Sequence, residues 1–192
     1  MNAARRSWSD PPGGTLPWLI VLLELGTFSI VFVAISMLRR SEPKVFAAGT
    51  AALSQPFGLG LTLLLLTSGA AAASGVRAYR VGERRRSRAR LLGAAGLGLG
   101  FVVVKLLDYA HHAARGHGLG ADLFWDTYVL ATGFHLLHVV VGVAVLGMAA
   151  RAAGREQLAD PETSIAGPAL FWHMCDVVWF ILWPLLFVGG KP

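Results

Sequence analysis

The chain has 192 residues, of which 55% are hydrophobic and 15% charged, and its mean hydropathy is +0.58. Soluble domains of this length are far less apolar, so the composition excludes an ordinary soluble enzyme. The net charge of +6 could suggest a nucleic-acid partner, but the distribution of the basic residues predicts membrane topology and no nucleic-acid binding.

Five apolar runs follow one another along the chain, and each is close to the length of about 20 residues that a helix needs to cross a bilayer. They lie at about 17–38, 57–76, 91–110, 127–150 and 167–188. The residues that remain suffice only for short connections. We therefore predict an all-α integral membrane bundle of five transmembrane helices, with residues 1–192 forming a single domain.

A cluster of arginines separates the second run from the third: Arg77, Arg80, Arg84, Arg85, Arg86, Arg88 and Arg90. With five spans, this connection lies on the same side of the membrane as the N-terminus and the fourth connection. That side carries most of the lysines and arginines. Because cytoplasmic loops carry an excess of these residues, we expect the N-terminus in the cytoplasm and the C-terminus outside.

The third run is rich in small residues. Gly93, Gly96 and Gly100 follow one another at steps of three and four residues, which places them on one face of a helix. Such a face lets the backbone of a neighbouring helix approach closely. We therefore expect another helix of the bundle to pack on these glycines.

Ionisable side chains occur at hydrocarbon depth in several of the runs. We call them the polar seam: Glu24, Lys105, Asp108, His135, His138, His173 and Asp176. A charge inside a bilayer costs at least about 2.5 to 3.5 kcal/mol, so such residues usually face the interior of the bundle and pair with one another. The polar seam is therefore the candidate site.

The depth of each side chain suggests its partner. A helix rises 1.5 Å per residue, and counting from the cytoplasmic ends places Glu24 level with His173, and His138 level with Asp176. We predict these two interhelical pairs. Lys105 and Asp108 lie one turn apart on one helix and are expected to form a local ion pair.

The residue types leave several uses of the polar seam open. His135 and His138 share a helix at a three-residue step and cannot be opposite ligands of one haem, while His173 lies at a different depth from His138. A metal site of His135, His138 and Asp176 is conceivable, because two histidines and a carboxylate suit iron or zinc. A proton relay through Glu24 and simple hydrogen bonding between helices are the other interpretations.

Two motifs resemble a known family. Residues 132–142 (TGFHLLHVVVG) are similar to the penultimate helix of subunit III of haem-copper oxidases, and residues 171–179 (FWHMCDVVW) are similar to its last helix. Glu24 falls where that family carries a membrane-embedded glutamate. The resemblance extends over essentially all five runs in the family's order.

The departures from the family pattern are specific. Leu136 stands where the family usually has glycine, Asp108 replaces the usual glutamate, and the first two helices of the seven-helix members have no counterpart. Leu136, the Phe-Trp-His-Met sequence and a Trp-Pro pair near the end are closer to the short NorE-like branch, which is associated with nitric oxide reductase. Within the family, the resemblance therefore favours that branch over a short cytochrome c oxidase subunit III.

The resemblance implies a subunit with no haem, metal or catalytic residue of its own. Its partner would be the haem-containing catalytic subunit of an oxidase or nitric oxide reductase, which carries the haem and the iron or copper. The chain would support assembly, stability and proton uptake of that respiratory complex, in the bacterial cytoplasmic membrane and in contact with membrane lipids. The alternative is an independent membrane b-type cytochrome or metal-binding enzyme that uses His135, His138 and His173.

Overall fold

The computed structural model describes residues 14–155, 158 and 160–188. The predicted domain over 1–192 also includes residues 1–13 and 189–192, which lie outside this description. The elements follow in the order α1 (Thr15–Ser41), α2 (Pro43–Ala52), α3 (Gln55–Arg80), α4 (Arg84–Ala113), α5 (Leu123–Ala153), the π-helical turn η1 (Glu162–Ala166) and α6 (Gly167–Phe187). Five helices, α1, α3, α4, α5 and η1 with α6, are long and apolar enough to cross a membrane, which confirms the predicted fold class.

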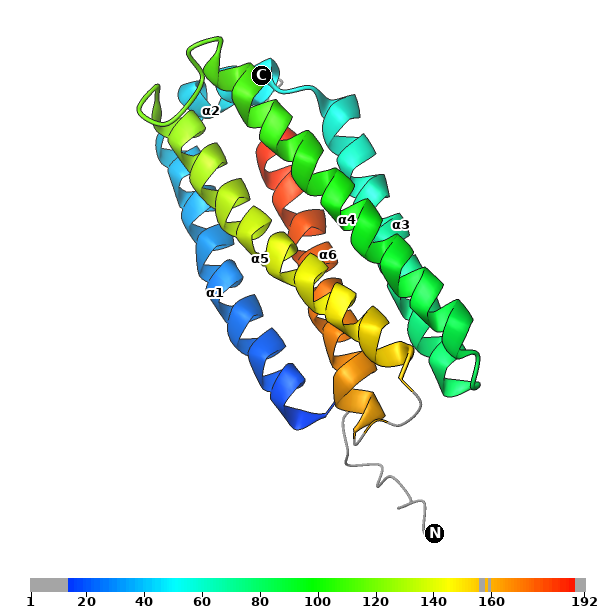
Figure 1. Ribbon diagram of the computed structural model, residues 1–192. Helices are drawn as coiled ribbons and strands as arrows, with labels where there is room; N and C mark the ends of the chain where they lie inside the picture. The colour runs from blue at the N-terminus through cyan, green and yellow to red at the C-terminus, as the bar shows by residue number, and fades with distance from the viewer. Residues whose placement is uncertain (1–13, 156–157, 159, 189–192) are drawn as a thin grey trace.

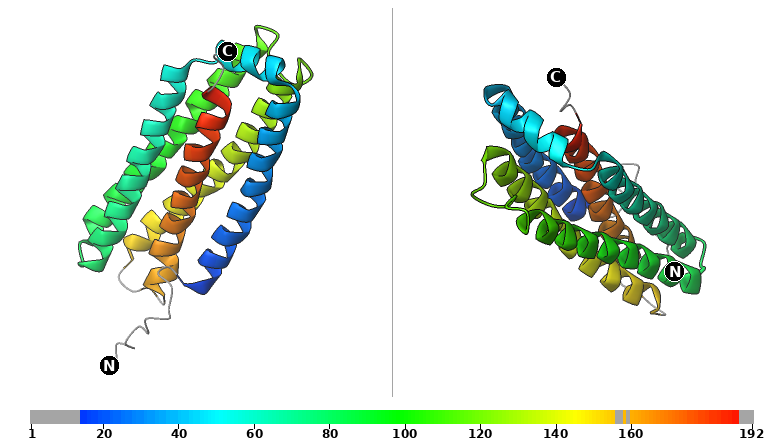
Figure 2. Two further views of the ribbon diagram at one scale, coloured as in Figure 1. Left: turned by 180° about the vertical axis from the view of Figure 1, so that it is seen from behind. Right: turned by 90° about the horizontal axis from the view of Figure 1, so that it is seen from above.

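The long helices form one bundle in which α6 holds a central position (Figure 1). α6 packs against α1, α3 and α5, and α4 packs between α3 and α5. The start of α1, the α3–α4 turn, the end of α5 and η1 lie at one end, which we call the basic end because the arginine cluster lies there (Figure 2). The end of α6 and the α4–α5 connection lie at the opposite end, the far end.

Each of α1, α3, α4 and α5 includes the run that predicts it and extends beyond it, whereas α6 ends at Phe187, one residue before the predicted end. Hydropathy marks only the part of a helix inside the hydrocarbon, whereas the helices continue with polar residues beyond it. The arginine cluster shows this most clearly, because it lies in the last turn of α3 and the first two turns of α4 rather than in a loop. Between them is a tight turn in which Gly82 has a φ of 83°, a conformation that glycine adopts without strain.

The short helix α2 is absent from the sequence prediction. It lies at the far end, where it contacts α5 and the end of α6 (Figure 2). Pro43 occupies its first turn, where a missing backbone N–H is harmless. α2 has ten residues and is too short to cross a bilayer, so a search for apolar runs of about 20 residues does not find it.

Close helix packing surrounds the indole of Trp172, which is fully buried. A Cβ atom added to Gly142 of α5 would lie 2.6 Å from Cε3 of this ring, and one added to Gly98 of α4 would collide with its other edge. The ring of α6 therefore fits between two glycines. The predicted glycine face is different: nothing lies within 4 Å of a Cβ added at Gly93, Gly96 or Gly100, so no described helix packs closely there.

The outward faces of the helices are apolar. Large hydrophobic side chains such as Leu23 and Ile30 of α1, Leu63 of α3 and Leu137 of α5 are more than half exposed. In water such a surface would be unfavourable, whereas hydrocarbon chains solvate it. The distribution agrees with five membrane-spanning helices.

Candidate functional site

The polar seam divides into three hydrogen-bonded groups and one isolated histidine. Glu24 pairs with His138, His173 pairs with Asp176, and Lys105 and Asp108 form the centre of a larger network. His135 stands apart from all three groups. The groups lie on different helix pairs, so each has its own geometry and chemistry.

The first group joins α1 to α5. Oε2 of Glu24 lies 3.1 Å from Nε2 of His138, and Nδ1 of His138 lies 2.8 Å from the carbonyl oxygen of Phe134. A carbonyl can only accept, so Nδ1 carries a proton and donates it. Nε2 and the carboxyl group are then left to share one further proton. The ring of Phe28 covers His138 edge-on, with centroids 5.1 Å apart, and shields the pair.

This geometry gives the Glu24–His138 pair a definite chemistry. The shared proton can sit on the carboxyl group, which donates to a neutral imidazole, or on the imidazole, which donates to a carboxylate. Both forms keep the hydrogen bond and the same total charge. The two side chains are largely but not fully buried, with 24% of Glu24 and 12% of His138 exposed. The pair can therefore hold a proton at a partly accessible position within the span.

The second group lies on α6 and faces α3. Nδ1 of His173 is 3.2 Å from Oδ2 of Asp176, one turn further along the same helix. Gly69 of α3 makes room for this carboxylate, because a Cβ at that position would collide with Oδ2. The other carboxylate oxygen, Oδ1, is buried without a hydrogen-bond partner among the described residues.

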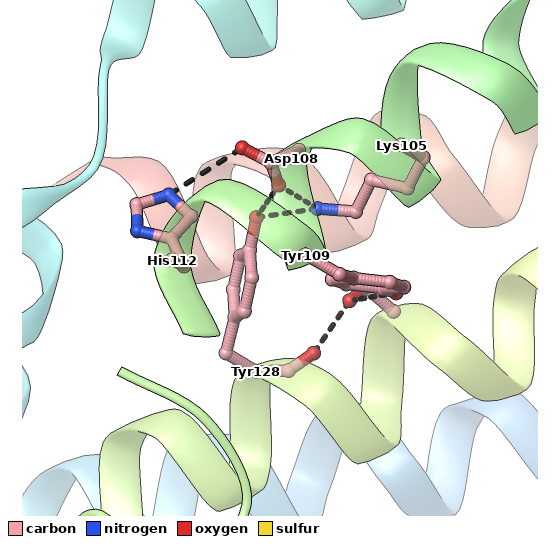
Figure 3. Close-up of polar contacts among 6 residues, drawn as sticks. Lys105, Asp108, Tyr109, His112 and Tyr128 are labelled. Atoms are coloured by element: carbon pink, nitrogen blue, oxygen red, sulfur yellow. Dashed lines mark hydrogen bonds and ion pairs between the residues drawn. The ribbon is translucent and has the colours of Figure 1, made fainter. Parts of the chain in front are cut away.

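The third group joins α4 to α5 near the far end (Figure 3). Nζ of Lys105 lies 2.8 Å from Oδ2 of Asp108, and the Tyr128 hydroxyl donates to the same oxygen at 2.6 Å while also contacting Nζ. Lys105 has no exposed surface. Its charge is offset by this carboxylate and by the rings of Tyr109 and Tyr128, whose centroids lie 4.7 and 4.2 Å from Nζ.

His135 is fully buried among aromatic rings. It stacks on Trp179 at 5.4 Å and meets the edges of Phe28 and Phe101 at about 6 Å. Within the described part of the chain, neither ring nitrogen has a hydrogen-bond partner. The surroundings are those of a packed aromatic side chain rather than of a metal ligand.

Two of the three predicted pairs are wrong in their partners. Glu24 pairs with His138 and not with His173, and Asp176 pairs with His173 and not with His138. Equal depth does not place two side chains on facing sides: His138 points to α1, while Asp176 points to α3. The predicted ion pair between Lys105 and Asp108 is confirmed.

The same geometry separates the proposed metal ligands. His138 is hydrogen-bonded to Glu24, and Asp176 is hydrogen-bonded to His173. His135 is surrounded by aromatic rings. Across residues 14–155, 158 and 160–188, no three histidine, cysteine, aspartate or glutamate side chains gather closely enough to hold a metal ion. The arrangement therefore gives the metal and haem interpretations no support.

Sequence reasoning missed Tyr128 and its neighbours on α5. Tyr128 contacts both members of the Lys105–Asp108 pair, and Thr132, one turn further, shares a hydrogen bond of 2.7 Å with Tyr109. The sequence does contain a pattern that indicates this contact, because Tyr128 and Thr132 are four residues apart and therefore lie on one face of α5. The segment is rich in aromatic residues, so it was read as apolar packing.

Comparison with known proteins gives a consistent result. The sequence profile described as cytochrome c oxidase subunit III matches residues 22–191. Quinol oxidase subunit 3 of Bacillus spizizenii is 25% identical over 178 residues, which are 90% of this chain and 85% of that protein. Cytochrome c oxidase subunit 3 of Thermostichus vulcanus is 31% identical over 130 residues, 66% of this chain and 63% of that protein. Probable quinol oxidase subunit 3 of Staphylococcus saprophyticus is 22% identical over 174 residues, 90% of this chain and 87% of that protein.

Proposed function

Because the chain belongs to the cytochrome c oxidase subunit III family, we propose that it is a non-catalytic membrane subunit of an oxygen-reducing haem-copper oxidase. The observation that carries this proposal is the match over residues 22–191, which includes most of α1 and all the other helices. The haem, the copper and the reaction then belong to a catalytic partner. This chain packs beside that partner in a bacterial respiratory membrane.

Apart from the Glu24–His138 pair, the polar seam supports a role in packing rather than in turnover. The Lys105–Asp108 and His173–Asp176 groups each form hydrogen bonds inside the chain. Side chains used in this way hold helices in register and are not available as ligands of a redox centre. The proposal therefore assigns the chain to assembly and stability of the complex.

The choice of oxygen rests on the names of the relatives. Three relatives that cover most of their own length or of this chain are subunits of quinol oxidases or a cytochrome c oxidase. None of these names refers to nitric oxide reductase, so they lend no support to the NorE-like branch that the motifs favour. That branch rests on Leu136, the Phe171–Trp172–His173–Met174 sequence and the Trp183–Pro184 pair, and it stays a prediction.

We further propose that the Glu24–His138 pair serves proton movement on the cytoplasmic side of the complex. The pair shares one proton, lies within the span and keeps partial exposure. Either member of the pair can hold this proton while the hydrogen bond between them is kept. Lys105 and Asp108 are both hydrogen-bonded to the hydroxyl of Tyr128, and this arrangement suits a structural role.

The test is purification of the chain from its natural host through an affinity tag, in a mild detergent. We expect a haem-containing partner to co-purify and the complex to consume oxygen but not nitric oxide. Consumption of nitric oxide would instead establish the NorE-like interpretation. If the chain purifies alone and its own spectrum shows a haem band that is lost on changing His138 or His173, the subunit proposal is wrong.

A second experiment tests the proton role in that complex. Glu24→Gln keeps a hydrogen bond to His138 but cannot exchange a proton, whereas Glu42→Gln changes a carboxylate that is exposed at the far end. We expect both variants to keep their haem content. Proton uptake per electron should fall for Glu24→Gln alone, and unchanged uptake would leave Glu24 a structural residue.

A further inference from the structure

The outward face of α6 carries one polar side chain in an apolar strip. The strip consists of Leu170, His173, Val177 and Phe180, which follow one another at steps of three and four residues. Phe180 is 58% exposed, and the side chain of His173 is 43% exposed. Figure 2 shows α6 between α1 and α3 when the bundle is seen from behind, and both of these helices pack against it. Among the described residues, this strip is therefore open to the outside of the bundle.

His173 lies near the middle of its membrane span. At a rise of 1.5 Å per residue, it is about 17 Å from the start of the span Glu162–Phe187 and about 21 Å from its end. Its ring lies beside Gly69 of α3, because a Cβ added to that glycine would lie 3.3 Å from Nδ1. Hydrocarbon chains offer no hydrogen bonds at this depth. A polar ring that faces them costs free energy, and a protein surface that bonds to it removes that cost.

Asp176 determines what His173 offers to the outside. Nδ1 of His173 is bound to Oδ2 of Asp176 at 3.2 Å, and Oδ1 is buried without a partner among the described residues. A net charge in hydrocarbon is costly, so the pair holds one proton between these two groups. A proton on Oδ1 would have no acceptor, so it sits on Oδ2 or on Nδ1. In both forms Nε2 carries its own hydrogen and faces outward as a donor.

A cavity of about 460 Å³ extends from His173 between α3 and α6. Three of the residues in its wall are small: Ala73 of α3, Ala166 of η1 and Ala169 of α6. Small residues on a membrane helix let the backbone of a neighbouring helix approach closely. The shape of this face therefore suits another helix.

The same cavity carries a cation nearer to the basic end. Arg77 lines it and is exposed, and it has no ion-pair partner among the described residues. Arg80, one turn further, is already held by Glu162 at 3.0 Å. Arg77 and Nε2 of His173 both donate hydrogen bonds, so a surface that complements this face carries acceptors and a negative charge.

The depth of His173 distinguishes a protein helix from a lipid as the occupant. The acceptors of a phospholipid lie in its headgroup and ester region, near the membrane surface. An acyl chain would therefore lie against His173 and leave its Nε2–H unsatisfied. A membrane helix can present an acceptor side chain at any depth, and such hydrogen bonds between helices contribute to their association.

We propose that this face of α3 and α6 is the docking surface for a transmembrane helix of the haem-containing catalytic subunit. That helix places an acceptor oxygen, of a hydroxyl or a carboxamide, against Nε2 of His173 and a carboxylate against Arg77. The inference rests on the proposed function, which supplies the partner, and it names the surface that the partner meets. It is separate from the Glu24–His138 pair, which joins α1 to α5.

The test is photo-cross-linking in the complex purified through a tag on this chain. The photoreactive amino acid p-benzoylphenylalanine replaces Phe180 or, as the matched control, Leu137, which is 62% exposed on α5. We expect position 180 to cross-link to the haem-containing subunit and position 137 not to do so. Any other product at position 180 overturns the proposal: lipid alone, a second copy of this chain, or none. The partner still co-purifies in those cases, whereas a chain that purifies alone refutes the proposed function itself.

Variants test the cation in the same complex. Arg77→Gln breaks no ion pair among the described residues, so a weaker complex reports a contact with the partner. The haem that stays with the tagged chain on dilution gives the Kd, which should rise roughly two- to fivefold. Arg85→Gln, an exposed arginine of α4, is the control and should leave the Kd unchanged. Equal weakening by the two variants would refute the contact.

The contact of His173 is tested by changing each member of its pair. His173→Phe keeps a ring but removes Nε2–H, and the Kd should rise about fivefold. Asp176→Asn alters the same pair from the inside and leaves the imidazole in place, so the Kd should stay close to wild type. If both variants weaken the complex equally, the pair acts only through the fold of this chain and the docking surface is wrong.

Discussion

Glu24 of α1 and His138 of α5 lie 3.1 Å apart and share a single proton between their facing atoms. α1 otherwise packs mainly along α6, and of its residues only Val21, Phe28 and Ile35 are buried. The contact thus links α1, the most exposed long helix, to the neighbouring helix α5. Its removal should be felt in stability as well as in proton exchange.

Glu24→Ala should lower the stability of the purified chain by about 1 kcal/mol, because it leaves Nε2 of the largely buried His138 without its partner. Glu24→Gln should stay close to wild type, and Glu42→Ala is the control on an exposed carboxylate. The measurement is thermal unfolding with a thiol-reactive dye, since Cys175 is buried and is the chain's single cysteine. Equal effects of Glu24→Ala and Glu42→Ala would contradict the pairing.

Lys105→Met should destabilise the chain by about 3 to 5 kcal/mol, since it leaves the buried carboxylate of Asp108 without its cation. Lys105→Met combined with Asp108→Asn should recover much of the loss. The asparagine carries no charge, and its oxygen still accepts from Tyr128. The same dye measures unfolding, with the exposed Lys44→Met as the control, expected within about 0.5 kcal/mol of wild type. A double variant no more stable than Lys105→Met would argue against charge as the cause.

Gly142→Ala should cost about 1 to 3 kcal/mol, because the new methyl group must displace the ring of Trp172. Gly147→Ala, five residues further on the same helix, meets nothing within 4 Å and should be neutral or stabilising by up to about 1 kcal/mol. Comparing the two unfolding temperatures removes the general effect of replacing glycine in a helix. Similar temperatures would mean that Trp172 is not held between the glycines.

His135→Leu should leave stability unchanged or raise it, since both ring nitrogens lack hydrogen-bond partners among the described residues. His138→Leu should lower stability, because the carboxyl group of Glu24 loses its partner. The pair of variants distinguishes two histidines one turn apart on α5. A loss for His135→Leu as large as that for His138→Leu would show that His135 has a polar partner after all.

The sequence predicted the spans well and the short elements poorly. A run of about 20 apolar residues has few alternatives to a membrane helix, so all five long helices could be placed. The polar turns beyond each run lack the hydropathy signal that marks a span. For this reason the arginines from Arg84 to Arg90 were placed in a connection instead of in α4. α2 has no length signal and was missed.

The candidate site shows a different limit. Spacing within one helix was informative, since Lys105 and Asp108 were correctly paired from a three-residue step. Pairing across helices depends on rotation about each axis as well as on depth, and one residue changes that rotation by about 100°. Depth alone therefore assigned Glu24 and Asp176 to the wrong histidines, although all four residues do form pairs.

The collision between Asp176 and any side chain at position 69 has a consequence for evolution. A side chain at position 69 would displace this carboxylate from its place against α3, so a larger residue there requires a change in the position or identity of residue 176. In natural relatives, glycine at the position of Gly69 and aspartate at the position of Asp176 should therefore be inherited together. A relative with a larger residue at the position of Gly69 should carry a smaller residue at the position of Asp176, or an aspartate whose side chain points away from α3.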